Sequence, residues 1–311
     1  MTAFNDMSER FIGVDVGGTK VSVAVLTDGE LSEPHVAPTD VSGADALIEQ
    51  LVRAIGTAAG DDEITAVGLG VPSVVDWENG RVRASVNIPL EDVPLRDILR
   101  ERLDVPVFVD NDASVAALAE AHESGARHLV MLTVGTGVGG GVVLDGRLFR
   151  GATGAAPELG HMVIAALFDD HGEPEHAERF PQPGSLEALA SGRALDRLAR
   201  ERGFEDGPAV VDAADTGDEA ACEALALLGH RLGIGIANAI NAFDPEVLAI
   251  GGGVSRAGDL LLDPARETAR RFVLPGVGTR TEIRTARVGQ KAGVLGAALL
   301  AEQELNLEVR T

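Results

Sequence analysis

Apolar positions along this 311-residue chain occur in two arrangements that alternate from end to end. Short continuous apolar runs, such as 11–16 and 129–134, are typical of buried strands. Longer stretches carry apolar residues at helical spacing; the segment 44–59, for example, places Leu47 and Leu51 on one face. Strands and helices that alternate in this way predict an α/β protein built in layers.

The same pattern assigns the individual elements of both halves. It predicts strands at 11–16, 21–26, 64–71, 105–109, 129–134, 247–250 and 282–286. It predicts helices at 44–59, 95–103, 113–123, 186–202, 219–243 and 292–302. The segment 163–183 is irregular, acidic and proline-bearing, so we expect a surface excursion there.

Two segments, 17–31 and 134–148, share one pattern. Each has a Gly/Thr turn, an apolar strand and an Asp-Gly pair followed closely by leucine. The pattern predicts two β-hairpins, closed by type I′-like turns at Asp28-Gly29 and Asp145-Gly146. Because glycine lets backbone N–H groups converge on anionic oxygens and threonine adds a hydroxyl donor, the repeat indicates a duplicated fold that grips a polyphosphate. The candidate phosphate-binding residues are Gly17, Gly18, Thr19 and Lys20 in the first loop and Gly135, Thr136 and Gly137 in the second.

Two better-known phosphate motifs do not fit these loops. The segment 135–140 satisfies G-x-G-x-x-G, but that dinucleotide fingerprint requires a helix after the glycines, and 142–146 reads as a strand and turn. The first loop approaches a Walker A motif, yet it ends in Gly-Thr-Lys and is again followed by a strand.

Composition narrows the classes of partner. The net charge of −23 argues against nucleic acid and anionic membranes as partners. Lys20 and Lys291 are the only lysines and tyrosine is absent, a composition that indicates a high-salt cytoplasm, with an acidic protein from a GC-rich genome as the alternative. No apolar run is expected to reach transmembrane length, and the single cysteine, Cys222, is expected to be a small buried hydrophobe. We therefore expect a cytoplasmic protein.

Acidic residues follow several of the predicted strands. Asp15 precedes the first glycines and either caps the turn or holds Mg²⁺, through water because Mg²⁺ keeps most of its hydration shell. Asn111 and Asp112 open the helix 113–123, so they either cap that helix or supply a carboxylate base with an amide that orients a hydroxyl.

A second group of polar residues lies in the second half. Glu158 and His161 share one tight turn, where they could bind a polyol, hold a metal or decorate the surface. Glu187 reads by itself as a charge that complements the N-terminus of the helix after it.

These pieces together resemble the ROK family of sugar kinases and repressors, over nearly the whole chain. The residues that carry the resemblance are, in order, 11–20, 68–72, Asn87, 111–113, 135–141, 158–161, Glu187, 190–192, 251–253 and 292–298. The resemblance implies the actin-like ATPase (ribonuclease H-like) α/β fold, with two lobes around a central cleft that takes ATP and a hexose. We place the smaller lobe at 1–112, completed by the helix 291–311, and the larger at 113–290.

The resemblance also implies roles for residues. Asp112 corresponds to the catalytic base of the family, and the two glycine loops correspond to those that hold the phosphates. The sugar contacts would be Gly70, Asn87, Asn111, Asp112, Glu158, His161 and Glu187. Gly251 and Gly252 would border the adenosine.

The chain departs from the family at several positions. The family's zinc-binding cysteine positions fall on Glu178, Phe180 and Ser185, so we expect no structural zinc and a metal-free His161. Pro157 replaces a glycine before Glu158, and Ser114 and Ser73 replace a common asparagine and a frequent glycine. These departures bear on the choice of hexose more than on the chemistry.

The expected function is therefore ATP- and Mg²⁺-dependent phosphorylation of a hexose, foremost glucose at O6. The alternatives are a kinase for fructose, mannose, allose or N-acetylmannosamine, a non-catalytic sugar-binding protein, and a sugar-sensing repressor. Members of the family are commonly dimers or tetramers, so we also expect a homo-oligomer.

Overall fold

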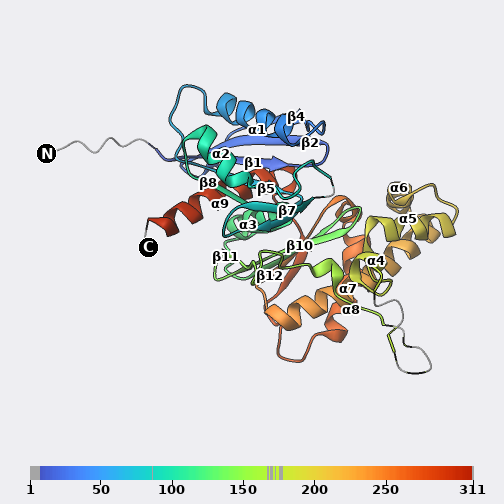
Figure 1. Cartoon of the computed structure of the whole chain (residues 1–311). Helices are drawn as coiled ribbons and strands as arrows, with labels where there is room; N and C mark the ends of the chain where they lie inside the picture. The colour runs from blue at the N-terminus through green and yellow to red at the C-terminus, as the bar shows by residue number, and fades with distance from the viewer. Residues whose placement is uncertain are drawn as a thin grey trace. The chain divides into compact units, whose positions relative to one another are not determined.

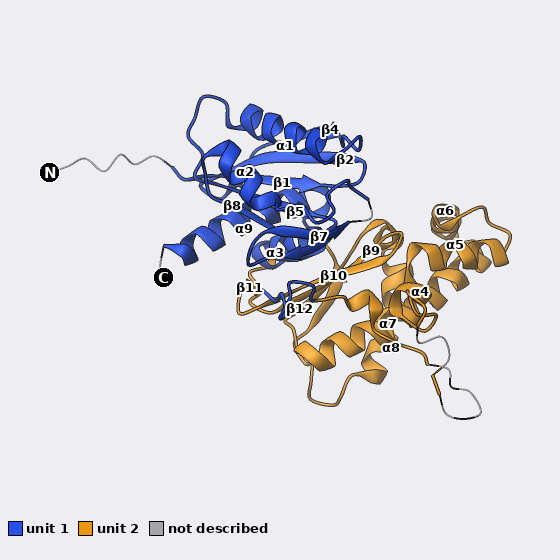
Figure 2. Ribbon diagram, viewed as in Figure 1, with its two compact units in different colours: residues 1–123, 148–156, 288–311 blue, residues 124–147, 157–287 orange. Residues whose placement is uncertain are grey.

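The computed structural model describes residues 8–85, 87–166, 168, 171, 173–174 and 178–309, and Figure 1 shows the order of their helices and strands. Contacts divide the chain into two compact units, which Figure 2 colours separately. Unit 1 comprises 1–123, 148–156 and 288–311, and unit 2 comprises 124–147 and 157–287. Unit 1 includes the helix after Asn111 and the segment 148–156, both of which the division from the sequence assigned to the larger lobe.

Unit 1 is built on a mixed sheet. Its strands are β1 (Arg10–Val16), β2 (Lys20–Thr27), β3 (Glu30–Leu31), β4 (His35–Pro38), β5 (Ala66–Val71), β6 (Ser73–Asp76), β7 (Arg81–Ser85) and β8 (Val107–Asn111). Its helices are α1 (Ala44–Ala59), α2 (Leu95–Leu103), α3 (Asp112–Ser124), the 3₁₀ turn η3 (Gly289–Lys291) and α9 (Ala292–Glu308). The main sheet has the order β3-β2-β1-β5-β8, with β4 also on β2, while β6 and β7 form a separate hairpin.

The two faces of this sheet are covered by different helices. Ile12, on one face of β1, belongs to a core that includes Leu47 of α1 and Leu99 of α2. Phe11, on the other face, packs in a cluster with α3 and with Leu299 of α9. Because successive strand residues point to opposite faces, one continuous apolar strand supplies both cores.

Unit 2 repeats the same sheet. Its strands are β9 (Leu129–Val134), β10 (Val138–Leu144), β11 (Arg147–Leu148), β12 (Val247–Gly251) and β13 (Glu282–Thr285), in the order β11-β10-β9-β12-β13. Its helices are η1 (Leu159–His161), α4 (Leu186–Ala190), α5 (Gly192–Glu201), α6 (Gly207–Asp215), α7 (Glu219–Phe243), η2 (Gly253–Ala257) and α8 (Asp259–Phe272). In each unit an antiparallel hairpin is followed by parallel strands, which confirms the predicted duplication.

Both predicted hairpin turns are confirmed. The φ angles of Asp28 and Gly29 are 52° and 80°, and those of Asp145 and Gly146 are 52° and 78°. Positive φ at both central residues defines the type I′ turn, whose twist matches that of the flanking strands.

The helix α7 corrects one expectation from the sequence. By length and composition alone it could cross a membrane, although no segment was expected to do so. Leu228, Leu232 and Ile236 of this helix are nevertheless fully buried in the core of unit 2, so its apolar character is that of a core helix. Cys222, on the same helix, is half-buried rather than fully buried.

Three further differences have local causes. The predicted helix 186–202 is broken at Ser191, which ends α4 and caps α5 by accepting a hydrogen bond from the N–H of Ala194. The helices α6 and α8 were not predicted, and α8 contains Pro264, which is unusual inside a helix. The strand predicted at 105–109 lies at 107–111, so Asn111 is its last residue.

Candidate functional site

The carboxyl ends of three parallel strands in unit 1 lie side by side. Asp15 of β1 is opposite Gly70 of β5, and Gly70 is opposite Asp110 of β8. This edge is where open α/β sheets bind ligands. Gly70 has room for no side chain, because an added Cβ would lie 2.6 Å from a methyl group of Val115.

The first candidate phosphate loop is a tight turn held by its own backbone and by Thr39. The N–H of Gly17 donates to the carbonyl of Lys20, and the hydroxyl of Thr39 donates to the carbonyl of Gly17 at 2.6 Å. Thr19 and Lys20 are exposed. Thr39, on the far side of β2, was not predicted from the sequence and stabilises this loop.

Asn87 lies beside the first loop. A Cβ on Gly18 would be 3.1 Å from the Cβ of Asn87, so the two backbones approach closely. Unit 1 therefore brings a predicted sugar contact next to a predicted phosphate contact.

Asp15 is half-buried between the first loop and the start of α9. A Cβ on Gly293 would lie 2.5 Å from the carboxyl carbon of Asp15, so only glycine leaves room for this carboxylate. Burial raises the pKa of Asp15 above its ordinary value, and the positive charge of Lys20 opposes that rise. A single partly buried carboxylate at the mouth of a phosphate loop fits Mg²⁺, which takes few protein ligands and keeps several waters.

Asn111 caps helix α3. Its Oδ1 accepts hydrogen bonds from the N–H groups of Ala113 (2.9 Å) and Ser114 (3.2 Å), and its Nδ2 donates to the carbonyl of Ser73 at 3.3 Å. The capping interpretation is thus confirmed for Asn111. Asp112 is the first residue of α3, where the helix N-terminus stabilises a carboxylate.

The second candidate phosphate loop, in unit 2, is held by three hydrogen bonds. The N–H of Gly135 donates to the carbonyl of Gly137, and the N–H of Gly192, at the start of α5, donates to the carbonyl of Gly135 at 2.7 Å. The Oε2 of Glu187 accepts the N–H of Val138 at 2.9 Å. Glu187 therefore touches the phosphate loop directly, a contact that the sequence did not predict, while Thr136 is exposed at the tip.

Glu158, His161 and Glu187 come close together in unit 2. Glu158 directly precedes the turn η1 and His161 is its last residue; η1 lies against β10 so tightly that a Cβ on Gly160 would overlap the carbonyl of Val138. Glu158 is exposed as a whole residue, but partial burial of its carboxyl raises its pKa; His161 opposes this rise and the negative charge of Glu187 adds to it. The three side chains therefore lie within electrostatic reach of one another.

Strand β12 ends beside the second loop. Gly251 is opposite Thr133 of β9, and Gly252 has a φ of 84°, the left-handed region that favours glycine. A Cβ on Gly252 would overlap the carbonyl of Val134, the residue that enters the second loop. Gly252 is thus a close approach of two backbones at the predicted nucleotide end of the sheet.

The segment 163–183 packs beside His161 where it is described. The N–H groups of Ile164 and Ala165 donate to the carbonyl of Gly184, and the ring of Phe180 meets that of His161 edge-on, with centroids 6.3 Å apart. Residues 167, 169–170, 172 and 175–177 lie outside the described part of the chain. Within the described part, no group of three or more His, Cys, Asp or Glu side chains is arranged to hold a metal ion.

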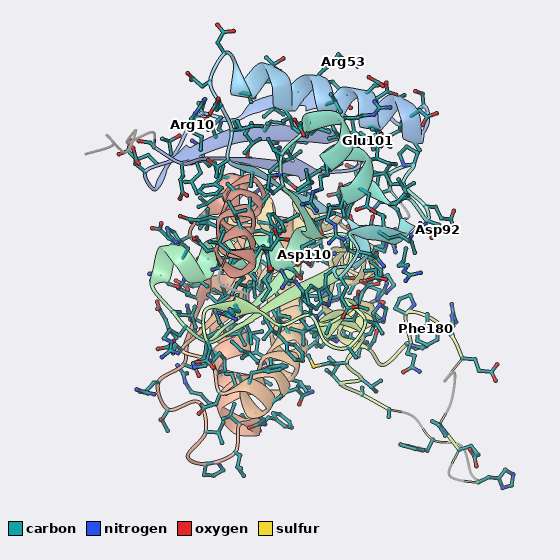
Figure 3. The ribbon with its side chains drawn as sticks, turned by 60° about the vertical axis from the view of Figure 1, so that its left-hand side comes forward. Arg10, Arg53, Asp92, Glu101, Asp110 and Phe180 are labelled. Carbon is teal, nitrogen blue, oxygen red and sulfur yellow. The ribbon has the colours of Figure 1, made fainter. Side chains whose placement is uncertain are left out.

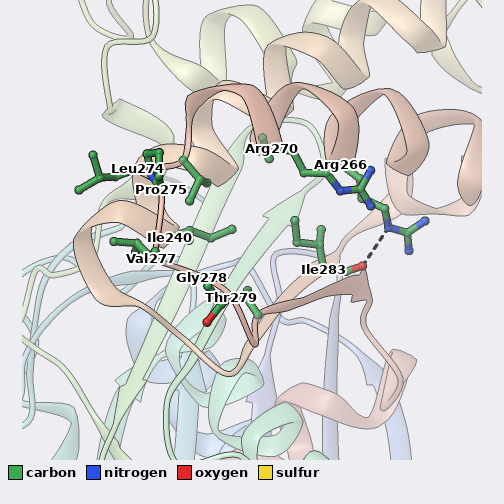
Figure 4. A pocket seen from close by; sticks show the side chains of 13 residues that line it. Ile240, Arg266, Arg270, Leu274, Pro275, Val277, Gly278, Thr279 and Ile283 are labelled. Carbon is green, nitrogen blue, oxygen red and sulfur yellow. Dashed lines mark hydrogen bonds between the residues drawn. The ribbon is translucent and has the colours of Figure 1, made fainter.

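A pocket of about 420 Å³ lies elsewhere in unit 2 (Figure 4). It is lined by Ile240, near the end of α7, by Ile283 of β13 and by Arg266 of α8, whose Nε donates to the carbonyl of Ile283. Ile283 is near the start of β13, which runs parallel to β12. Gly251 is at the other end of this strand pair, as the last residue of β12. None of the predicted site residues lines this pocket.

The chain is similar to known glucokinases and a hexokinase in sequence and in fold. A sequence model of the ROK family matches residues 11–304. The glucokinase of Halalkalibacterium halodurans is 36% identical over 96% of this chain and 97% of its own length. The ROK hexokinase of Thermus thermophilus has a TM-score of 0.80 at 36% identity, covering 96% of this chain and 99% of its own. The ROK family glucokinase of Streptomyces griseus, solved in complex with glucose and AMPPNP, has a TM-score of 0.75 at 32% identity, covering 94% and 99%.

Proposed function

This chain belongs to the ROK family, and we propose that it is an ATP-dependent glucokinase that transfers a phosphoryl group to O6 of glucose. The observation that carries the proposal is its similarity to glucokinases over nearly the full length of both chains. The actin-like ATPase fold of the family agrees with the two sheets of identical strand order. One of the similar structures is that of a hexokinase, so other hexoses are included in the test.

We assign the role of catalytic base to Asp112. Its carboxylate would take the proton of the 6-hydroxyl as the oxygen attacks the γ-phosphorus and the bond to ADP breaks. Phosphoryl transfer needs little covalent help from the protein, so the remaining residues orient the two substrates and neutralise charge. Asn111 caps the helix that begins at Asp112 and so helps to fix the position of this carboxylate.

The phosphates would be held by both hairpin loops. Gly17, Gly18 and Thr19 offer backbone and hydroxyl donors, and the ammonium of Lys20 offers a positive charge. Gly135, Thr136 and Gly137 do the same from the second loop, with Gly251 and Gly252 beside the adenosine. Mg²⁺ bound through water to Asp15 would neutralise charge that develops on the phosphate oxygens.

We assign the sugar contacts that the family resemblance implies to Gly70, Asn87, Asn111, Asp112, Glu158, His161 and Glu187. When carboxylates and amides form a hydrogen bond with each hydroxyl of a sugar, an analogue that lacks one hydroxyl has a much lower kcat/KM. Ser73, Ser114 and Pro157, where the chain departs from its family, are the positions at which the preferred hexose would be decided.

We further propose a cytoplasmic homo-oligomer, a dimer or tetramer, that works at high salt and binds neither nucleic acid nor membrane. The net charge of −23 and a lysine content of only two residues support the high-salt assignment, because salt screens the repulsion among carboxylates.

A coupled ADP-release assay tests the proposed function. The wild-type protein is given Mg-ATP and, separately, glucose, fructose, mannose, allose and N-acetylmannosamine, at low salt and in multimolar KCl. We expect glucose to give the highest kcat/KM. ADP release that is independent of sugar, or absent with every sugar from folded protein, would contradict the proposal.

The Glu187 contact with Val138 predicts that one residue serves both substrates. Glu187→Ala removes a sugar contact and also frees the N–H of Val138 in the phosphate loop. We expect the KM values for glucose and for ATP both to rise, each by roughly 10- to 100-fold, since a hydrogen bond to a charged group contributes about 1.5–3 kcal/mol. A variant in which only the glucose KM changes would show that the loop does not depend on Glu187.

The raised pKa of Glu158 predicts a pH dependence of sugar binding. The ionised carboxylate accepts hydrogen bonds from hydroxyl groups, and burial makes it take up a proton at a higher pH than an ordinary glutamate. Glucose affinity should therefore fall as the pH is lowered, beginning above the ordinary glutamate range. Calorimetry of wild type and Glu158→Gln across pH checks this: the variant should bind glucose weakly at all pH values, and an equal pH dependence in both proteins would contradict the assignment.

A further inference from the structure

A cluster of charged side chains lies inside unit 1 and includes Asp110, two residues before Asp112 in the chain. Its members are Asp110 at the end of β8, Arg150 in the segment 148–156, and Glu304 of α9. The Nε of Arg150 donates to Asp110 Oδ2 at 2.6 Å, and its second terminal nitrogen donates to Glu304 Oε1 at 2.7 Å. Figure 3 shows Asp110 within the unit, in contrast to Asp92 and Arg53 at its surface.

The cluster is shielded from water. The side chains of Asp110 and Arg150 are only 3% and 14% exposed. Burial raises the pKa of Asp110, and the positive charge of Arg150 opposes that rise. The guanidinium also lies over the ring of Trp77, 5.2 Å from its centroid, so an aromatic side chain covers the remaining face. One arginine therefore joins β8, α9 and the β6–β7 hairpin.

Stability alone does not account for such a cluster. One guanidinium faces two carboxylates, of which Asp110 is buried and Glu304 is 20% exposed, and well-packed apolar side chains can often replace buried ion pairs without loss of stability. What ion pairs of this kind do provide is a fixed geometry, since each hydrogen bond has a narrow range of distance and angle.

The geometry is transmitted towards Asp112 through the backbone. Asp110 uses its second oxygen, Oδ1, to accept the N–H of Asn111 at 2.8 Å, while Oδ2 is held by Arg150. Asn111 in turn caps the helix that begins at Asp112. The chain of contacts therefore runs from Arg150 to Asp110, to the backbone of Asn111 and to the residue that follows it.

We propose that Arg150 and Asp110 are positioning residues, which hold the junction between β8 and α3 so that the carboxylate of Asp112 meets the acceptor hydroxyl. This inference rests on the proposed function, in which Asp112 is the base. Because a displacement of about 1 Å at a reacting group can cost roughly 10²-fold in rate, a loosened junction should lower kcat more than it raises KM.

The test is a double-mutant cycle with Arg150→Met, Asp110→Asn and the double variant. Turnover is measured per glucose-binding site, counted by calorimetry, so that loss of folded protein does not count as loss of rate. We expect Arg150→Met to lower kcat by roughly 10²-fold with little change in the glucose KM, and the double variant to be no slower than the slower single variant. Arg150→Lys keeps the charge but has a single donor nitrogen in place of the guanidinium, so its kcat should lie between that of Arg150→Met and that of wild type.

Arg266→Met is the matched control. Arg266 also binds two carboxylates, Asp259 and Asp263, but lies in unit 2 on α8. Its loss should leave kcat per binding site unchanged. If Arg150→Met keeps the wild-type kcat per site, the positioning role is overturned. If Arg150→Met does not fold, a wild-type kcat per site in both Arg150→Lys and Asp110→Asn overturns it. Absence of sugar-dependent turnover in wild type would instead overturn the proposed function and this inference with it.

Discussion

Asp112→Asn should lower kcat by roughly 10²–10⁴-fold, the range over which a positioned base accelerates proton transfer. Asparagine has nearly the same shape as aspartate and still accepts hydrogen bonds, but it does not take up a proton from the 6-hydroxyl. The N-terminus of α3 and the cap by Asn111 remain, so the fold around the site should be kept. The loss therefore falls on turnover rather than on binding.

The control for charge is Asp104→Asn. Asp104 is an exposed aspartate that ends α2 in the left-handed conformation, which asparagine also adopts readily. This variant removes the same charge from unit 1 and should keep the wild-type kcat. Glucose binding by calorimetry should be similar in all three proteins. An Asp112→Asn enzyme with near-normal kcat would show that another group takes the proton.

The second large effect is on stability, and it comes from a glycine. Gly68 lies in the middle of β5, paired with Gly13 of β1, where α9 rests directly on the sheet. A Cβ on Gly68 would overlap the carbonyl oxygen of Ala297, a backbone atom that moves only with the helix. Gly68→Ala should therefore lower the free energy of unfolding by about 3 kcal/mol or more, the upper end for an overpacked core.

Gly56→Ala makes the same chemical change with the opposite result. Gly56 is exposed on α1, and a Cβ there would meet nothing within 4 Å. Alanine in a helix interior is favoured over glycine by up to about 1 kcal/mol, so this variant should be more stable than wild type. Urea unfolding of the two variants beside wild type measures both changes. Equal stability of Gly68→Ala and wild type would mean that α9 is not seated on the sheet as described.

Local sequence patterns predicted the elements whose signals are local. The apolar runs and the Asp-Gly turns were sufficient for both hairpins, because a type I′ turn needs only residues that adopt positive φ. The helices 44–59, 95–103 and 219–243 were predicted to the residue for the same reason: their apolar spacing extends to their ends. The helix α8 lacked such a signal, because Pro264 disfavours a helix there. The packing of α8 against α7 overrides this local preference in the fold.

Contacts between residues far apart in the sequence could not be predicted in this way. Arg150 and Asp110 are 40 positions apart, and Glu304 is a further 154 positions from Arg150. Nothing in the neighbourhood of an arginine indicates that it will be buried, because most arginines are exposed. Thr39 at the first loop and the Glu187–Val138 hydrogen bond are of the same kind. The residue types of the candidate site were thus readable from the sequence, whereas the contacts that hold them in place were not.

The most direct test of the central claim is the identity of the product. Wild type and Asp112→Asn are incubated with Mg-ATP and glucose in multimolar KCl, and glucose 6-phosphate is measured by an NADP-linked dehydrogenase specific for that ester, beside the ADP released. The proposed function predicts equal amounts of glucose 6-phosphate and ADP from wild type and a small fraction of either from the variant. ADP without glucose 6-phosphate, or product from the variant at the wild-type rate, would contradict it.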